Sequence, residues 1–516
     1  MIKFSYMKKA KKIFTTTVIG TVVAILTLTT GLSWAQNPPT MKMTTEIPPG
    51  ITTPDDIETR IGTLTFFDGV PIGETTDKVY NFLDFQHAYQ AFMSGIQIAS
   101  VDAIRKGILE LGPANTNAVI YEELMDSTSL FLTANTTSVY MFSWLQLEDE
   151  PMVIETPPDV LGIIDDHWFK YVADFGRLGP DQGQGGKFLI LPPGYEGEVP
   201  EGYYVARTNT YGNWILWRGF QVDGSTKTAV DATKNNFRIY PLSQKDNPPT
   251  MSFVNASGKL VNTIHRMDDK IFDEINEVVQ SEPSEGESPE ILGILASIGI
   301  KKGQEFNPDA RMREIFTKAA NAGSVTVKTI MSKPRDEMFY FYPGESNWLN
   351  PFPGGSYEWV NEGAKLLDAR AGFHYYATGI TPAMAKEIIG KGSKYAYTYL
   401  DADGNPLDGS KTYKVNVPPN VPAKDFWSFT IYDNQTRSML QTDERFPGID
   451  DNRPGIVQNS DGSYDIYFGP EAPQGQENNW VQTIPGRGWN TIFRLYGPLE
   501  PWFEKTWRPG EIELIE

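Results

Sequence analysis

Two arginines, Arg218 and Arg494, lie inside aromatic runs whose composition is typical of β-strands. The runs cover residues 214–220 and 493–496. A positive charge in such a run needs an anionic partner, which is either the carboxylate of a ligand or an acid of the protein itself. The first alternative would make both arginines part of a binding site, and the second would make them structural.

Three aromatic residues, Tyr140, Trp144 and Trp427, lie on other segments that read as strands. Aromatic faces on a sheet either stack on a flat or apolar ligand or fill a core. We predict that these three residues and the two arginines form a site for a small organic ligand in a cleft between two β domains. The predicted ligand-binding residues are therefore Tyr140, Trp144, Arg218, Trp427 and Arg494.

The sequence contains none of the common catalytic signatures. It has no cysteine, which excludes thiolate catalysis and cysteine-ligated metal sites. It also lacks a Gly-x-Ser-x-Gly nucleophile elbow, a phosphate-binding loop and a dinucleotide-binding fingerprint. No catalytic residue, metal ligand or cofactor is assigned, and whether the protein is an enzyme stays open.

Four histidines are scattered along the chain without the spacing of a metal-binding motif: His87, His167, His265 and His374. His167 follows two aspartates, so a carboxylate could raise its pKa or share a metal with it. A metal-dependent hydrolase built on His167 or His374 is therefore kept as an alternative function.

The N-terminus has the pattern of a signal peptide. Five lysines precede an apolar run over residues 13–32, and small residues at Ser33 and Ala35 fit a cleavage site. We expect residues 1–35 to be removed, the mature chain to start at Gln36, and the protein to be periplasmic or secreted. No later segment is long and apolar enough to span a bilayer, so no stable membrane insertion is expected after cleavage.

The mature chain is strongly acidic. Removing five lysines leaves 40 basic residues against 65 acidic residues, a formal charge of −25. Nucleic acid is a poor partner for such a surface, and we predict no nucleic-acid binding. The alternative explanation of this acidic balance is solubility alone. Whether the protein forms a homo-oligomer stays open.

Turn-separated short strands dominate two regions, and a helical region lies between them. The predicted fold is mainly β with helical additions (α+β), in which two β-sandwich or jelly-roll-like domains are joined by a helical insertion. We place the N-terminal β domain with its leading helices at residues 36–260, the helical insertion at 261–335 and the C-terminal β-sandwich at 336–516.

Two ordered sets of short motifs carry a resemblance that covers nearly the whole mature chain. The N-terminal set is Phe131-Leu132-Thr133-Ala134-Asn135, Gly185-Gly186-Lys187-Phe188-Leu189, Leu191-Pro192-Pro193-Gly194-Tyr195 and Val199-Pro200-Glu201-Gly202-Tyr203. The C-terminal set is Phe426-Trp427-Ser428, Tyr432-Asp433, Thr436-Arg437-Ser438-Met439-Leu440, Asp461-Gly462-Ser463, Asn479-Trp480 and Arg494-Leu495-Tyr496-Gly497-Pro498. With these motifs the chain resembles an uncharacterised bacterial two-domain family that pairs domain of unknown function 1254 (N-terminal) with domain of unknown function 1214 (C-terminal).

The resemblance implies a pair of β-sandwich domains with helical additions and implies no reaction. One departure is visible in the N-terminal part. Similar proteins often read Asn-Thr-Asp-Thr where this chain reads Asn135-Thr136-Thr137-Ser138. An aspartate with a chemical role at position 137 would be missing here.

Two functions remain besides the metal-dependent hydrolase. The first is an exported protein that binds or converts a small organic ligand in a cleft between its β domains. The second is a non-catalytic structural or assembly module, which the missing catalytic motifs favour. A deep cavity with a perturbed titratable group would favour the first, and a large apolar patch or a stable oligomer without such a cavity would favour the second.

Overall fold

A computed structural model describes residues 42, 44–148 and 150–515, so the predicted signal peptide lies outside the described residues. The chain divides into two compact units, residues 1–75 and 76–516. The described part of the first unit is a small antiparallel sheet in the order β1-β2-β3. Its elements are η1 (Pro49–Ile51), β1 (Asp56–Thr59), β2 (Gly62–Phe67) and β3 (Val70–Pro71).

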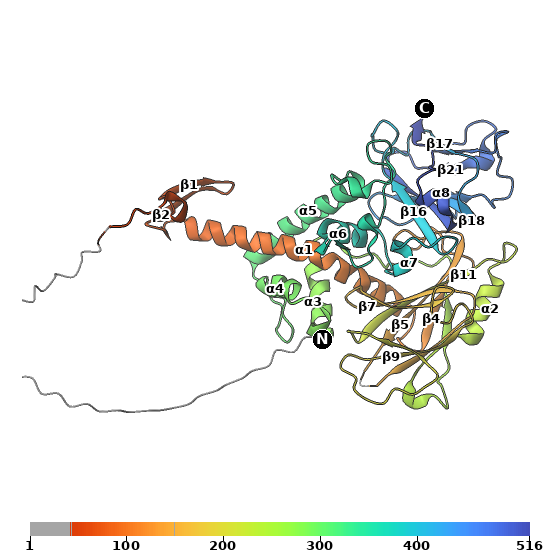
Figure 1. The fold of residues 1–516 in the computed structure, drawn as a ribbon, viewed down its shortest axis with the longest axis horizontal. Helices are drawn as coiled ribbons and strands as arrows, with labels where there is room; N and C mark the ends of the chain where they lie inside the picture. Colours follow the sequence, from red (N-terminus) through yellow and green to blue (C-terminus); the bar gives the residue numbers. More distant parts are fainter. Residues whose placement is uncertain (1–41, 43, 149, 516) are drawn as a thin grey trace, which may run out of the picture. The chain divides into compact units, whose positions relative to one another are not determined.

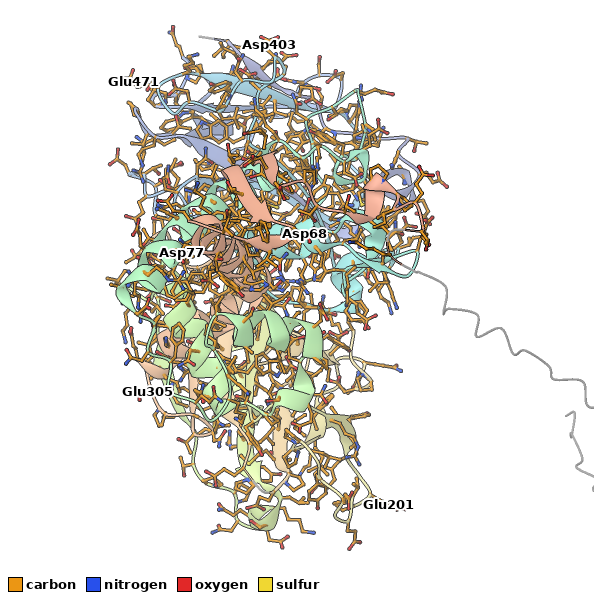
Figure 2. The ribbon with its side chains drawn as sticks, turned by 90° about the vertical axis from the view of Figure 1, so that its left-hand side faces the viewer. Asp68, Asp77, Glu201, Glu305, Asp403 and Glu471 are labelled. Carbon is orange, nitrogen blue, oxygen red and sulfur yellow. The ribbon has the colours of Figure 1, made fainter. Side chains whose placement is uncertain are left out.

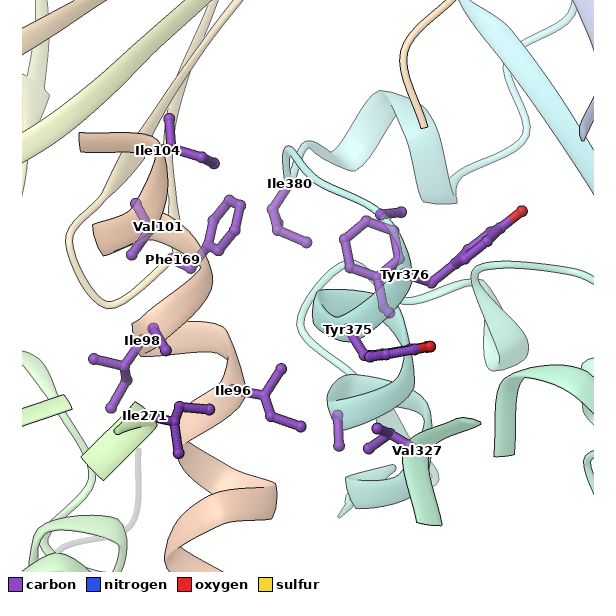
Figure 3. Packing of buried hydrophobic residues seen from close by; sticks show 14 of the residues in the cluster. Ile96, Ile98, Val101, Ile104, Phe169, Ile271, Val327, Tyr375, Tyr376 and Ile380 are labelled. Carbon is purple, nitrogen blue, oxygen red and sulfur yellow. The ribbon is translucent and has the colours of Figure 1, made fainter. Parts of the chain in front are cut away.

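The second unit is organised around a long helix, α1 (Thr75–Leu109). The C-terminal half of α1 is rich in small and branched apolar residues, and it is buried there in the largest apolar cluster. Figure 3 shows Ile96, Ile98, Val101 and Ile104 of α1 in this cluster, with Ile380 packed across from them. The helix thus gains its stability from tertiary packing of its apolar residues.

The N-terminal β region contains two sheets. A six-stranded sheet has the order β13-β4-β5-β11-β7-β8, and a four-stranded sheet has the order β10-β9-β6-β12. Helix α2 (Lys227–Asn236) follows β11. The strands are β4 (Asn117–Ile120), β5 (Ser138–Gln146), β6 (Met152–Thr156), β7 (Leu161–Asp166), β8 (Tyr171–Gly176), β9 (Gly186–Leu191), β10 (Tyr204–Arg207), β11 (Gly212–Phe220), β12 (Arg238–Pro241) and β13 (Ser252–Asn255).

Helices follow this region and lead to the second β region. The helices are α3 (Ile271–Ser281), α4 (Pro289–Ser297), α5 (Ala310–Ser332), α6 (Leu367–Tyr376) and α7 (Pro382–Ala385). Ser288 caps α4 ahead of a proline at the first helical position, as the Ser-Pro pair predicts. Short elements in these connections are η2 (Leu242–Gln244), η3 (Ser284–Gly286), η4 (Glu337–Phe339), η5 (Pro353–Gly355), β14 (Val360–Asn361) and β15 (Ala364–Lys365).

The C-terminal β region also contains two sheets, each four-stranded, in the orders β16-β22-β18-β19 and β21-β20-β17-β23. The strands are β16 (Ser393–Thr398), β17 (Tyr413–Val417), β18 (Ala423–Asp433), β19 (Gly448–Asp450), β20 (Tyr464–Gly469), β21 (Trp480–Gln482), β22 (Trp489–Pro498) and β23 (Ile512–Leu514). Two short helices complete it, η6 (Glu477–Asn479) and α8 (Glu500–Phe503).

Each β region buries a separate apolar cluster between its two sheets. Because side chains alternate between the faces of a strand, the apolar residues on one face of β5, β11, β16 and β22 enter such a cluster. Met141 of β5 and Phe493 of β22 are examples. The intervening residues lie on the opposite faces, which meet helices and each other instead.

The prediction of a mainly β chain with added helices is confirmed at this level, because the described residues form an α+β structure of several open sheets. The finer jelly-roll arrangement stays a prediction. Among the described residues, no helix combines the length and the apolar character needed to span a membrane. Acidic side chains are spread over the outside of the second unit, as Glu201, Glu305, Asp403 and Glu471 illustrate (Figure 2).

Candidate functional site: a cavity between the two β regions

A cavity lies where the N-terminal and C-terminal β regions meet the segment that carries α6 and α7. About 100 Å³ of the cavity is open to the centres of water-sized molecules, and its walls are mainly apolar. Figure 1 shows α7 and β16 beside the end of the sheet that contains β7 and β11. A mainly apolar cavity with few polar groups is the usual form of a small-molecule site.

The floor of the cavity is one face of the six-stranded sheet. Strand pairing sets Tyr140, Arg218 and Leu161 in one row across β5, β11 and β7. The next row continues through Leu216 and Ile163 to Asp174 on the edge strand β8. Paired residues share a face of the sheet, so the polar groups Arg218 and Asp174 face the same space from positions two strands apart.

The opposite wall is a face of the sheet that contains β16, β22 and β18. Tyr395 of β16 pairs with Arg494 of β22, and Tyr397 pairs with Ile492. All four residues line the cavity. Because successive side chains of a strand lie on opposite faces, Phe493, the residue between Ile492 and Arg494, lies in the core behind this wall.

Arg218 lines the cavity, and no residue that the structure describes neutralises its charge. Its side chain forms no hydrogen bond and no ion pair with any residue that the structure describes, and it is only partly exposed. A guanidinium group carries five N–H donors. Arg218 therefore offers a fully unused set of donors to the contents of the cavity.

Arg494 is held firmly by comparison. Its Nη2 donates to the Thr133 carbonyl oxygen at 2.7 Å and to the Tyr432 hydroxyl at 2.6 Å, and its Nη1 donates to Thr430 Oγ1 at 3.1 Å. The Tyr432 hydroxyl in turn donates to the Ala134 carbonyl. Residues 133 and 134 belong to the loop before β5, so Arg494 fastens the two β regions together.

The two arginines repel each other electrostatically across the cavity. Within residues 44–148 and 150–515, no acid forms an ion pair with either of them. The alternative in which an internal acid is the partner of Arg218 and Arg494 thus finds no support among these residues. Two like charges in a mainly apolar cavity raise the electrostatic cost of the empty site.

Asp174 supplies the opposite charge on the floor of the cavity, which it shares with Arg218. Its Oδ1 accepts a hydrogen bond of 2.7 Å from Thr381 Oγ1, and the Tyr171 hydroxyl also binds it. Burial raises the pKa of Asp174 to about 6, against the lowering effect of these two hydrogen bonds. Thr381 is the N-cap of α7, so Asp174 also positions the segment that covers the cavity.

Two hydroxyl groups of the wall are buried without a hydrogen-bond partner among the described residues, namely Thr378 Oγ1 and Ser393 Oγ. Between Thr378 and Thr381 the chain turns at Gly379, whose φ of 83° a side chain would strain. A Cβ at Gly379 would also lie 3.1 Å from the Ile163 side chain. The glycine lets this segment approach the sheet closely and so shapes one end of the cavity.

The structure brings three of the five predicted ligand-binding residues together, because Tyr140, Arg218 and Arg494 all line this cavity. It places the other two elsewhere. Trp144 is buried four residues along β5 from Tyr140, with its ring 4.9 Å from the His167 ring. Trp427 points into the core of the C-terminal β region, where it contacts Phe493.

Sequence reasoning missed Asp174, Tyr395, Thr381 and Ser393 as parts of the wall. Two signals were available for them. Asp174 is an acid inside an otherwise apolar strand, and Thr381-Pro382 is the signature of a capped helix start. Their assignment to one cavity depends on the pairing of β7 with β8 and of β16 with β22, which cannot be derived from the sequence.

The histidines kept for a metal-dependent hydrolase have other partners. His167 is buried, with Nδ1 at 2.7 Å from Glu282 Oε1 and Nε2 at 3.4 Å from Asp102 Oδ1. His374 Nδ1 is 2.8 Å from the Arg370 carbonyl oxygen. Among the described residues, no group of three or more histidine, aspartate or glutamate side chains is arranged to hold a metal ion.

A second, more polar hollow adjoins the cavity and shares Pro351, Phe352, Met384 and Tyr395 with it. Lys394 lines this hollow, and burial lowers its pKa to about 8. Its Nζ donates to the carbonyl oxygens of Met384 and Lys386. The hollow therefore meets the cavity at a boundary made by a few apolar side chains and Tyr395.

Comparison with known proteins finds two matching family models and a similar fold. Residues 115–241 match the model of "Protein of unknown function (DUF1254)", and residues 392–500 match that of "Protein of unknown function (DUF1214)". No curated protein matches the chain.

Two solved structures are similar to it. The VPA0106 protein from Vibrio parahaemolyticus aligns with 84% of this chain and all of its own at 19% identity, with a TM-score of 0.53. An uncharacterized protein from Burkholderia cenocepacia covers 86% of this chain and 97% of its own at 11% identity, with a TM-score of 0.39. The first likeness extends to the fold alone. The chain thus combines an N-terminal region that matches DUF1254 with a C-terminal region that matches DUF1214.

Proposed function

We propose that the protein is exported and binds a small organic anion in the cavity between its two β regions. The observation that carries the proposal is the pair Arg218 and Arg494, two mutually repelling cations on one apolar cavity with no acidic partner among the described residues. A bound carboxylate would neutralise them and would use the free donors of Arg218.

The walls restrict the rest of the ligand. Leu161, Leu216, Phe352, Phe373 and Ile492 give the cavity apolar surface around the arginines. Burial of apolar ligand surface against such residues contributes about 25 cal/mol per Å². The best ligand is therefore a carboxylate with an aliphatic or aromatic body, and not a small hydrophilic anion.

Tyr140 and Tyr395 add to the recognition of an anion. Tyr140 accepts a hydrogen bond of 2.9 Å from Asn135 Nδ2, which leaves its own O–H free to donate. The Tyr395 ring lies 5.9 Å from the Arg494 guanidinium carbon. Both hydroxyls stand beside the arginines on the paired strands, so they extend the set of donors that a carboxylate would meet.

Calorimetric titration with matched pairs of compounds tests the proposal. Octanoate and phenylacetate are compared with their neutral primary amides, in wild type and in Arg218→Gln. We expect each acid to bind more tightly than its amide, and Arg218→Gln to weaken acid binding about 30-fold or more, because a desolvated charge-assisted pair is lost. Arg335→Gln removes an arginine that is 91% exposed and serves as the matched control.

Two results would overturn the proposal. One is equal affinity for acids and amides in the wild type, and the other is acid binding that Arg218→Gln leaves unchanged. A flat response to every compound in the series would favour the non-catalytic assembly module instead.

A further inference from the structure

We infer that the ligand carries a hydrogen-bond donor, a hydroxyl or an amine, at the end opposite its carboxylate, and that Asp174 receives this donor. The inference rests on the proposed function and specifies the ligand class of the same site. It makes the ligand a bifunctional molecule with an apolar middle, held by an arginine at one end and an aspartate at the other.

The first step is the placement of Asp174 relative to Arg218. Both line the cavity from the same face of the six-stranded sheet. Asp174 lies on β8, two strands from β11 and two residues further along, so the two Cα atoms are roughly 12 Å apart for ordinary strand spacing. Leu161, Leu216 and Ile163 occupy the face between them.

The second step is the unused capacity of the carboxylate. An ionised carboxyl group has about four acceptor positions, and Asp174 uses its Oδ1 for Thr381 and accepts one further bond from Tyr171. Within the described part of the chain no lysine, arginine or histidine forms an ion pair with it. The nearby acid is Asp165, whose pKa is raised mainly by burial and further by the charge of Asp174.

A purely structural role does not account for a charged group here. Thr381 caps α7 by accepting the Ala383 N–H at 3.2 Å, and it only needs an acceptor for its own proton. An asparagine would supply that acceptor without placing an acid on an apolar wall. The nearby Thr378 Oγ1, which has no partner among the described residues, adds a second polar atom at this end.

The test compares three ligands with the same chain length: octanoate, 8-hydroxyoctanoate and 8-aminooctanoate. Wild-type protein is expected to bind the two bifunctional acids about tenfold more tightly than octanoate, the usual effect of one well-placed hydrogen bond. In Asp174→Asn the preference for the amine should disappear. Asp159→Asn, which neutralises an exposed acid, should keep the wild-type preference.

A pH series on wild type provides an independent measurement if Asp174→Asn folds poorly. Asp174 is faced by Asp165, Tyr171 and Tyr357, and burial raises its pKa to about 6. The preference for 8-aminooctanoate over octanoate should therefore fall as the pH drops through this value. The hydroxyl ligand should keep more of its preference, because its oxygen can accept a hydrogen bond from the O–H of the protonated carboxyl group.

The outcomes separate the two proposals. Octanoate binding as tightly as the bifunctional acids at every pH, while still depending on Arg218, would overturn the role of Asp174 and leave anion binding in place. A preference that survives unchanged in a folded Asp174→Asn protein would overturn it too. Acid binding that does not depend on Arg218 would instead remove the proposed function on which the inference rests.

Discussion

Arg218 and Arg494 come from sheets of different β regions and line one cavity, yet they differ in what holds them. Arg494 donates to a backbone carbonyl of the opposite region and to two side-chain hydroxyls, whereas Arg218 has no hydrogen-bond partner among the described residues. The first arginine is part of the framework of the cavity. The second is free to bind what enters it, and this difference gives the two residues opposite effects on stability.

Replacing Arg218 should stabilise the empty protein. Arg218→Met keeps an apolar body of similar length and removes a partly buried charge that repels Arg494. We expect the free energy of unfolding without ligand to rise by about 1 kcal/mol, as it often does when an uncompensated charge gives way to an apolar side chain. Urea unfolding measures it, with the exposed Arg335→Met as the control. A clear loss of stability in Arg218→Met would show that the charge has an unrecognised partner.

Replacing Arg494 should do the reverse. Arg494→Met leaves the Thr133 and Ala134 carbonyl oxygens without this donor and breaks the bonds to Tyr432 and Thr430. Loss of such a buried set costs roughly 3 kcal/mol. The same urea experiment should therefore show a lower midpoint for Arg494→Met than for wild type. Equal midpoints would mean that the loop before β5 does not depend on this contact.

The sequence predicted the mainly β composition and the helical additions because both follow from local patterns. Turn residues separate short aromatic strands, and capped starts mark helices. It also singled out Arg218 and Arg494, since a charge within an aromatic strand is conspicuous at any sequence position.

The face on which each residue lies depends on pairing. Arg494 is opposite Ser428, and Trp427 is opposite Leu495. One step along β18 thus separates the cavity face from the core face, and it explains why Trp427 is buried in the core. Trp144 shares its face with Tyr140, but its row is covered by His167. The residue types alone do not show how far along β5 the cavity extends or that His167 covers Trp144.

His167 should make stability depend on pH in the neutral range. Burial alone would lower its pKa, but its hydrogen bonds and charge interactions with Asp102 and Glu282 raise the pKa above its ordinary value. A histidine whose folded-state pKa is raised contributes stability fully below its unfolded pKa of about 6.5, and loses it as the pH rises through the folded value. The pKa of Asp102 is lowered, so its contribution is lost only in acid.

The measurement is the difference in unfolding free energy between wild type and His167→Gln. This difference should be larger near pH 6 than near pH 9, by on the order of 1 kcal/mol. His87→Gln, which replaces a partly buried histidine on α1, provides the matched comparison. A difference that stays constant across this range would mean that His167 is not charged in the folded protein.

Thr137 offers a way to supply the missing acid. Its Oγ1 lies 2.9 Å from the Tyr496 hydroxyl, and Tyr496 interacts electrostatically with both Arg494 and Arg218. A carboxylate at position 137 would therefore stand close to both cations. Thr137 is half-buried, and aspartate is a side chain of nearly the same size as threonine.

Thr137→Asp should raise the thermal midpoint of the empty protein and reduce the further rise that octanoate produces. The first effect follows from pairing two buried cations with an internal acid, worth about 1 kcal/mol here. The second follows because the new carboxylate competes for the same donors, and ligand stabilisation falls with affinity by mass action. Thr137→Asn has nearly the same shape without the charge and should behave as wild type. Equal thermal midpoints for the Asp and Asn variants would mean that the charge of the arginines is already neutralised in another way. The argument for an anionic ligand would then lose its basis.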